Sequence, residues 1–123
     1  MRATTTAFLA AAVLALSFVG VAAQDLVYDP GKDVTVPEVV KRVNARYTEE
    51  AKQNRIEGNV GLEVIVKDDG KVGDVKVTAS LDTVYGLDQE AVKAMKQWEF
   101  KPGTIKGRPV AVRVHVTMSF SLR

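Results

Sequence analysis

The C-terminal stretch, residues 110–123, constrains the fold of this chain more than any other feature. Apolar side chains stand at Val110, Val112, Val114, Val116, Met118, Phe120 and Leu122, and they alternate with Ala111, Arg113, His115, Thr117, Ser119, Ser121 and Arg123. Because successive side chains of a strand point to opposite faces, this period of two predicts one long strand with a dry face and a wet face. An amphipathic helix would repeat every 3.6 residues instead. The rest of the chain must therefore cover the dry face and supply the neighbouring strands.

Residues 1–23 are predicted to be a secretory signal peptide. Arg2 gives the positive start, residues 7–19 give the apolar run, and Val21-Ala22-Ala23 gives a small-residue cleavage site. The alternative is an uncleaved inner-membrane anchor, for which the apolar run over residues 7–23 is at the short end. The chain has no Cys, so neither a disulfide nor lipid attachment at a cysteine is possible.

The composition bounds the class of protein. Lys and Arg total 17 against 15 Asp and Glu, and this near balance argues against a nucleic-acid or acidic-membrane binder. With 46% hydrophobic residues the chain is not a disordered tail. After the signal, residues 24–35 are predicted to be a flexible lead-in, extended or loose, and residues 36–123 have the length of one domain with one core.

Local patterns place the other elements. Residues 36–45 are interpreted as irregular, because their valines fit both helical spacing and extended chain. The predicted elements are a short helix over residues 48–56, strands over 60–67 and 72–79, a helix over 89–98 and a turn-rich connection over 104–109 into the last strand. Thr48 and Asp88 suit helix N-caps, and Gly70 suits the turn of a hairpin.

This order of elements predicts the fold class. A sheet with one wet face must bury both helices on its dry face, which gives a two-layer α+β sandwich with three strands. The strand–helix–strand crossover around the main helix should be right-handed and leaves room for the first strand between the other two. The last strand then lies at an edge of the sheet.

The sequence offers no constellation for catalysis or metal binding. His115 is the only histidine, and a metal site needs several ligands. The run Asp68-Asp69-Gly70 lacks the spaced carboxylates of a calcium loop and suits a turn. We therefore predict no enzymatic activity, no metal and no cofactor. Trp98 falls on the apolar face of the main helix, which favours a core residue over a ligand-stacking platform.

Several short motifs occur in order and with compatible spacing. They are Tyr47 with Ala51, Ile56-Glu57-Gly58-Asn59-Val60, Asp69-Gly70-Lys71-Val72-Gly73-Asp74-Val75, Tyr85-Gly86-Leu87-Asp88, Trp98-Glu99-Phe100-Lys101-Pro102 and Gly107-Arg108-Pro109-Val110. Together they resemble the C-terminal domain of the TonB family over residues 36–122. That resemblance implies a three-stranded antiparallel sheet with two helices on one face, in the periplasm.

The resemblance also implies a function. The family's domain grips the TonB box, a short N-terminal segment of outer-membrane transporters, as an added strand beside its last strand, while an inner-membrane motor supplies energy. The expected partner-binding residues are Val110, Val112, Arg113, Val114, His115, Val116, Thr117 and Met118 on the last strand, together with Tyr47. Such an edge gives affinity through backbone hydrogen bonds and specificity through alternate side chains.

Two features depart from the family pattern. Thr48 stands where typical transducers have a proline after the tyrosine, and neither a Gln/Pro-rich approach nor a long Pro-rich spacer precedes the domain. The chain is therefore expected to act as the binding domain alone. The alternative is a freestanding periplasmic structural or assembly domain, which could bind another periplasmic protein or form a homodimer through the last strand.

Overall fold

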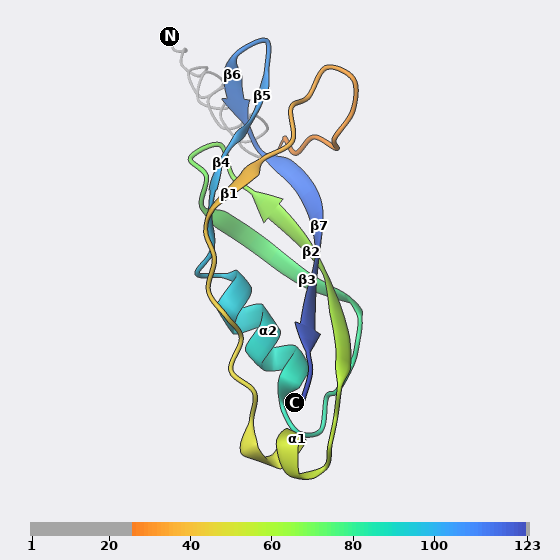
Figure 1. The fold of residues 1–123 in the computed structure, drawn as a ribbon. Coiled ribbons are helices and arrows are strands. Elements are labelled where there is room, and N and C mark those ends of the chain that lie inside the picture. Colours follow the sequence, from red (N-terminus) through yellow and green to blue (C-terminus); the bar gives the residue numbers. More distant parts are fainter. Residues whose placement is uncertain (1–25, 123) are drawn as a thin grey trace, which may run out of the picture.

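The computed structural model describes residues 26–122, so the predicted signal peptide and Arg123 lie outside the described residues. Its elements are β1 (Glu38–Lys41), α1 (Glu49–Gln53), β2 (Gly58–Val66), β3 (Val72–Ala79), α2 (Leu87–Met95), β4 (Glu99–Lys101), β5 (Gly103–Ile105), β6 (Arg108–Val110) and β7 (Val112–Phe120) (Figure 1). Within these residues, no helix has the length and apolar character needed to cross a membrane.

The central sheet has three strands in the order β3-β2-β7, and both pairings are antiparallel. Strand β2 lies in the middle and β7 lies at an edge, as the sequence predicts. The β2–β7 pairing runs without a shift in register from Gly58↔Phe120 to Val66↔Val112. The α+β fold with three antiparallel strands and two helices is thus confirmed.

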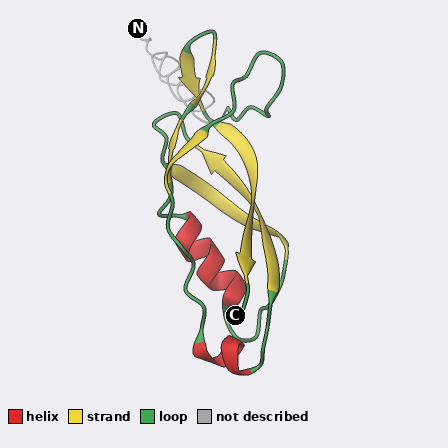
Figure 2. Ribbon diagram, viewed as in Figure 1, coloured by secondary structure: helices red, strands yellow, loops and turns green. Residues whose placement is uncertain are grey.

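The core lies between the sheet and the helices. Helix α2 crosses one face of the sheet, and α1 lies at the end where β2 begins (Figure 2). The dry-face positions of β2 are buried completely or nearly so: Val60, Leu62, Val64 and Val66. They belong to one cluster with Ala51, Leu87, Ala91, Ala94, Met95, Trp98, Phe100, Met118 and Phe120. The alternation in β2 and β7 therefore marks the buried face correctly.

Helix α1 begins at the predicted cap. The Thr48 hydroxyl accepts a hydrogen bond from the Ala51 N–H at 3.2 Å, which satisfies a free donor of the first turn. The same hydroxyl donates to the Tyr85 carbonyl at 2.8 Å. Thr48 therefore both starts α1 and ties it to the loop before α2.

Helix α2 differs from the prediction at both ends. It begins at Leu87 rather than Gln89, and its N-cap is Gly86, whose φ of 94° favours glycine. Asp88 lies inside the helix and is not the cap, because its carboxylate turns back and accepts from the Leu81 N–H at 2.9 Å. The helix ends at Met95, so Trp98 follows it rather than belonging to it.

Asp82 organises the loop that joins β3 to α2. Burial disfavours its charged form, but backbone N–H donors at Tyr85, Leu87 and Val84 together lower the pKa of Asp82 below its ordinary value. Those bonds measure between 2.9 and 3.1 Å. Because the Leu87 N–H is a free donor at the helix start, Asp82 does the capping that the sequence assigned to Asp88.

The predictions for residues 36–45 and 104–109 were wrong in part. Strand β1 forms within the first segment and pairs with β4, because the chain after Trp98 is extended and offers it a partner. Strands β5 and β6 form a hairpin around Lys106 and Gly107, whose φ values of 50° and 79° suit a tight turn.

The long last strand is also interrupted. Val110 ends β6, where it pairs with Gly103, and β7 begins only at Val112. The alternation of side chains continues through the break at Ala111, so the period of two could not reveal that the strand changes partner there.

The β2–β3 turn is held against β4. Gly70 has a φ of 86°, as predicted, and its carbonyl accepts from the Phe100 N–H at 2.9 Å. A Cβ at this position would lie 2.1 Å from the Phe100 carbonyl oxygen, so the close approach itself requires glycine.

Candidate functional site

The outer edge of β7, on the side away from β2, is paired near its beginning and open further along. The Arg113 N–H donates to the Tyr28 carbonyl and the Ala111 carbonyl accepts from the Tyr28 N–H, each at 2.9 Å, on the side away from β2. Because strand residues face alternate neighbours and the β2 register does not shift, the same side is presented by His115, Thr117 and Ser119. Within residues 26–122 these three have no backbone hydrogen-bond partner on that side.

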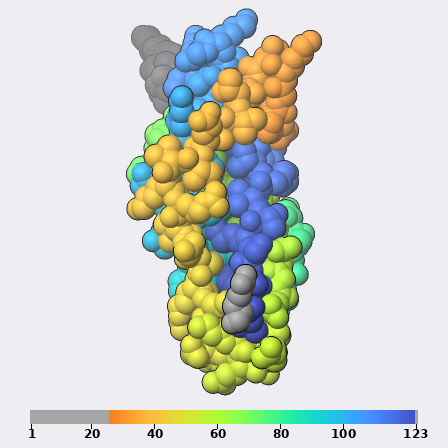
Figure 3. All heavy atoms as spheres, viewed as in Figure 1, coloured from red at the N-terminus to blue at the C-terminus, as the bar shows by residue number. Residues whose placement is uncertain are grey.

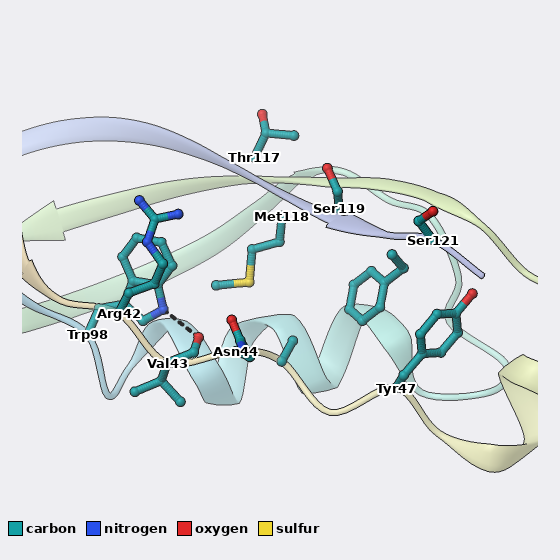
Figure 4. Close-up of a pocket in the computed structure, with 11 residues that line it drawn as sticks. Arg42, Val43, Asn44, Tyr47, Trp98, Thr117, Met118, Ser119 and Ser121 are labelled. Carbon is teal, nitrogen blue, oxygen red and sulfur yellow. Dashed lines mark hydrogen bonds between the residues drawn. The ribbon is translucent and has the colours of Figure 1, made fainter. Parts of the chain in front are cut away.

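A groove runs along this open edge. The extended segment 42–47 lies beside β7 on the front face of the molecule (Figure 3). Between them is a groove of about 420 Å³, lined by Arg42, Val43, Asn44, Ala45, Tyr47, Trp98, Thr117, Met118, Ser119, Phe120 and Ser121 (Figure 4). One wall is therefore a strand edge and the other is the segment before α1.

Trp98 fixes the second wall. Its indole Nε1–H donates to the Val43 carbonyl at 2.8 Å, and its side chain is only 6% exposed. The Arg42 guanidinium lies over the indole, 4.9 Å from the ring centroid, as a cation–π contact. Trp98 is thus a core residue, as predicted, and it also holds the groove wall in place.

Tyr47 closes the lower end of the groove. Its ring packs edge-on against Phe120 with centroids 5.4 Å apart. Its hydroxyl donates to the Ile56 carbonyl. Burial, followed by the nearby Glu57 carboxylate, raises the pKa of Tyr47 despite an opposing effect of Arg55. The phenol therefore stays protonated and keeps its donor role.

Comparison with known proteins identifies the family. A family model described as "Gram-negative bacterial TonB protein C-terminal" matches residues 43–122. The chain belongs to the TonB C-terminal family.

Two relatives agree with this assignment. Protein TonB of Vibrio cholerae is 37% identical over 84 residues, a match that covers 68% of this chain and 34% of the V. cholerae protein. This chain thus matches about a third of the length of that relative. The solution NMR structure of the Pseudomonas aeruginosa TonB CTD superposes with a TM-score of 0.59 at 25% identity, covering 76% of this chain and 90% of that chain.

The structure of this TonB C-terminal family member divides the predicted binding residues into three groups. Val110 lies in β6, away from the open edge. Val112 and Arg113 lie where Tyr28 already pairs with β7. The remaining predicted residues follow the open edge or face it: Val114, His115, Val116, Thr117, Met118 and Tyr47. Of these, Thr117, Met118 and Tyr47 line the groove.

Arg113 has ionic partners of its own. Its Nη1 lies 2.6 Å from Asp29 Oδ1, and its Nε lies 3.6 Å from Glu63 Oε2. It therefore serves the covered upper part of the edge rather than the groove.

Sequence reasoning missed most of the second wall. Segment 42–45 carries none of the short motifs that resemble the family, and basic residues such as Arg42 and Arg46 are by default solvated. Arg46 fits that view, since it is exposed and lies 3.7 Å from Glu90. Arg42 does not, because it packs on Trp98. The one available signal was Tyr47, which was assigned to the site and which ends this wall.

No cluster of three or more His, Cys, Asp or Glu residues that could hold a metal ion occurs among residues 26–122.

Proposed function

We propose that this chain is a periplasmic TonB-like binding module for TonB-dependent transport. In this proposal an extended segment of a partner protein binds as an added strand along β7, at His115, Thr117 and Ser119. The observation that carries it is the row of unpaired backbone groups facing a groove of matching direction. A strand laid in that groove would satisfy those groups.

The contacts set what such a segment must look like. Each new backbone hydrogen bond contributes about 0.5–1.5 kcal/mol, so a few of them give modest affinity with little dependence on sequence. Selectivity then comes from alternate side chains that enter the groove between Met118 and Trp98. The lining carries one charged residue, Arg42, which favours a segment without basic residues near that end.

The partner in this proposal is the N-terminal segment of an outer-membrane transporter. Family membership supports it, because the V. cholerae relative is a TonB protein. Secretion by a cleaved signal peptide at residues 1–23 belongs to the same proposal, since it would deliver the domain to the periplasm.

A freestanding structural or assembly domain is the second candidate. The regular β7 edge that could accept a peptide could equally pair with the same edge of a second copy. Self-association and peptide binding would then compete for one set of backbone groups.

Isothermal titration calorimetry on residues 24–123 tests the proposed function with peptides from transporter N-termini. Thr117→Pro removes an outward N–H and should abolish binding, whereas Thr117→Ala removes the same side chain, keeps the N–H and should bind within about threefold of the unaltered domain. Equal binding by both variants would contradict strand addition at this edge. A concentration-dependent dimer that binds no peptide would favour the second candidate.

A further inference from the structure

The lead-in before β1 is already paired with the sheet. Tyr28 forms a parallel bridge with Val112, through one hydrogen bond in each direction to Ala111 and Arg113. The next residue, Asp29, forms an ion pair with Arg113 at 2.6 Å. The flexible lead-in predicted from the sequence does not fit these contacts. Residues 26–29 occupy the upper part of the same edge whose lower part is open.

The pairing of the lead-in with β7 ends at residue 30. In a parallel ladder the next bond would run from the N–H of residue 30 to the Arg113 carbonyl. Residue 30 is proline, which has no N–H, so the ladder cannot continue there. The chain then turns away through Gly31 and Val34 and joins the β5–β6 hairpin, where the Thr35 N–H donates to the Thr104 carbonyl. The lead-in therefore covers residues 111–113 and leaves residues 115–119 uncovered.

The groove lies beside only one of the two parts of the edge. The groove lining begins at Thr117 on β7 and includes neither Ala111 nor Arg113. An uncovered edge in the upper part would expose backbone groups with no wall to select a partner. The lead-in fills that position.

We propose that residues 26–29 are an intramolecular competitor for the strand-accepting edge of β7. They cover the upper part, and Pro30 confines an incoming segment to the lower part. A segment long enough to pair above His115 must first displace Tyr28 and break the contact between Asp29 and Arg113. This role as a competitor rests on the proposed function, whereas the cover itself can be tested without any partner.

Amide hydrogen exchange on residues 24–123 tests the cover. The Arg113 amide should exchange at least tenfold more slowly than the outward amides of His115 and Thr117, in the same strand. Tyr28→Pro removes the N–H that donates to Ala111 but keeps the carbonyl that accepts from Arg113, so it should loosen the bridge and raise the Arg113 exchange rate severalfold toward that of Thr117. Val27→Pro is the matched control. The Val27 N–H points away from β7, so its loss should leave Arg113 protected. Fast exchange at Arg113 in the unaltered domain, or no effect of Tyr28→Pro, would overturn the proposal.

Peptide binding then tests the competition. A peptide long enough to span the whole edge should bind Tyr28→Pro about three- to tenfold more tightly than Val27→Pro, as expected when one of the two backbone hydrogen bonds of the bridge no longer has to be broken. A short peptide should bind both variants equally. Equal affinity of the long peptide would overturn the competitor role. Failure of every peptide with every variant would instead contradict the proposed function, and the exchange rates would still decide whether the edge is covered.

Discussion

The two outer edges of the central sheet are built differently. Along β3, the pairing with β2 shifts register twice, between Gly61 and Leu62 and between Val64 and Val66. Along β7 the pairing does not shift anywhere over its nine residues. Bulged strands bend and twist more, which makes them poor templates for a further strand. The β3 edge is therefore unsuited to pairing, and the β7 edge is regular.

The β3 and β7 edges also differ in charge and in what lies beside them. Strand β3 carries the exposed side chains of Asp74 and Lys76, and charges on an edge strand oppose pairing with another chain. The open part of β7 carries His115, Thr117 and Ser119 instead and faces a wall held by Trp98. A sheet of three strands can thus block one edge with bulges and charges and keep the other regular beside a groove.

The largest expected effect comes from removing the groove wall's anchor. Trp98→Ala should lower the free energy of unfolding by about 3–5 kcal/mol, because it empties a buried site and frees the Val43 carbonyl. Equilibrium urea denaturation measures this loss. A loss below about 1 kcal/mol would place Trp98 outside the core and leave the wall without its anchor.

Proline at neighbouring positions of β7 separates its two sides. Val116→Pro removes a donor that points to β2 and should cost about 3 kcal/mol or more. Thr117→Pro removes an outward donor and should cost less, by about the 0.5–1.5 kcal/mol of a ladder hydrogen bond. Denaturation of both variants under one set of conditions gives the difference. Equal costs would contradict a β7 strand whose one side is paired with β2 and whose other side is open.

Acid should lower the stability of the protein through Asp82, in the loop between β3 and α2. Its pKa is lowered in the folded state, so its contribution is complete above its unfolded pKa of about 4 and is lost as pH falls through the folded value. Asp82→Asn should cost about 1–3 kcal/mol at pH 7. Unfolding midpoints of both proteins should converge as the pH is lowered below 4. A difference that stays constant down to pH 2 would contradict this role.

The smallest expected effect concerns the blocked edge. The double variant Asp74→Val and Lys76→Val should change the free energy of unfolding by only about 0.5 kcal/mol, as for most surface changes. It should nevertheless increase self-association in sedimentation velocity, because the charges no longer oppose pairing of β3. Lys96→Val, an exposed change beyond α2, is the control and should stay monomeric. A monomeric double variant would show that the register shifts alone block this edge.

The sequence predicts the sheet well because its signals are local and periodic. Alternation identifies the buried faces of β2 and β7, and Gly70 identifies the hairpin turn. It fails where distant segments decide the structure. Strand β1 exists only because β4 lies beside it, and the break at Ala111 follows from the pairing of β6 with β5.

The candidate site shows the same limit. Family motifs and the long strand predict the edge, including Thr117, and Tyr47 opposite it. Nothing in the alternation distinguishes a covered residue such as Arg113 from an open one such as His115. The difference arises from Tyr28, which is far from Arg113 in the sequence and pairs with β7 through one isolated parallel bridge.

Strand addition at the β7 edge can be followed residue by residue in a backbone NMR titration of residues 24–123 with transporter N-terminal peptides. If a peptide adds as a strand there, saturable shifts should appear at His115, Thr117 and Ser119 and across the groove at segment 42–47, with β3 unchanged. Shifts centred on β3, or no shifts with any peptide on a well-folded domain, would contradict strand addition.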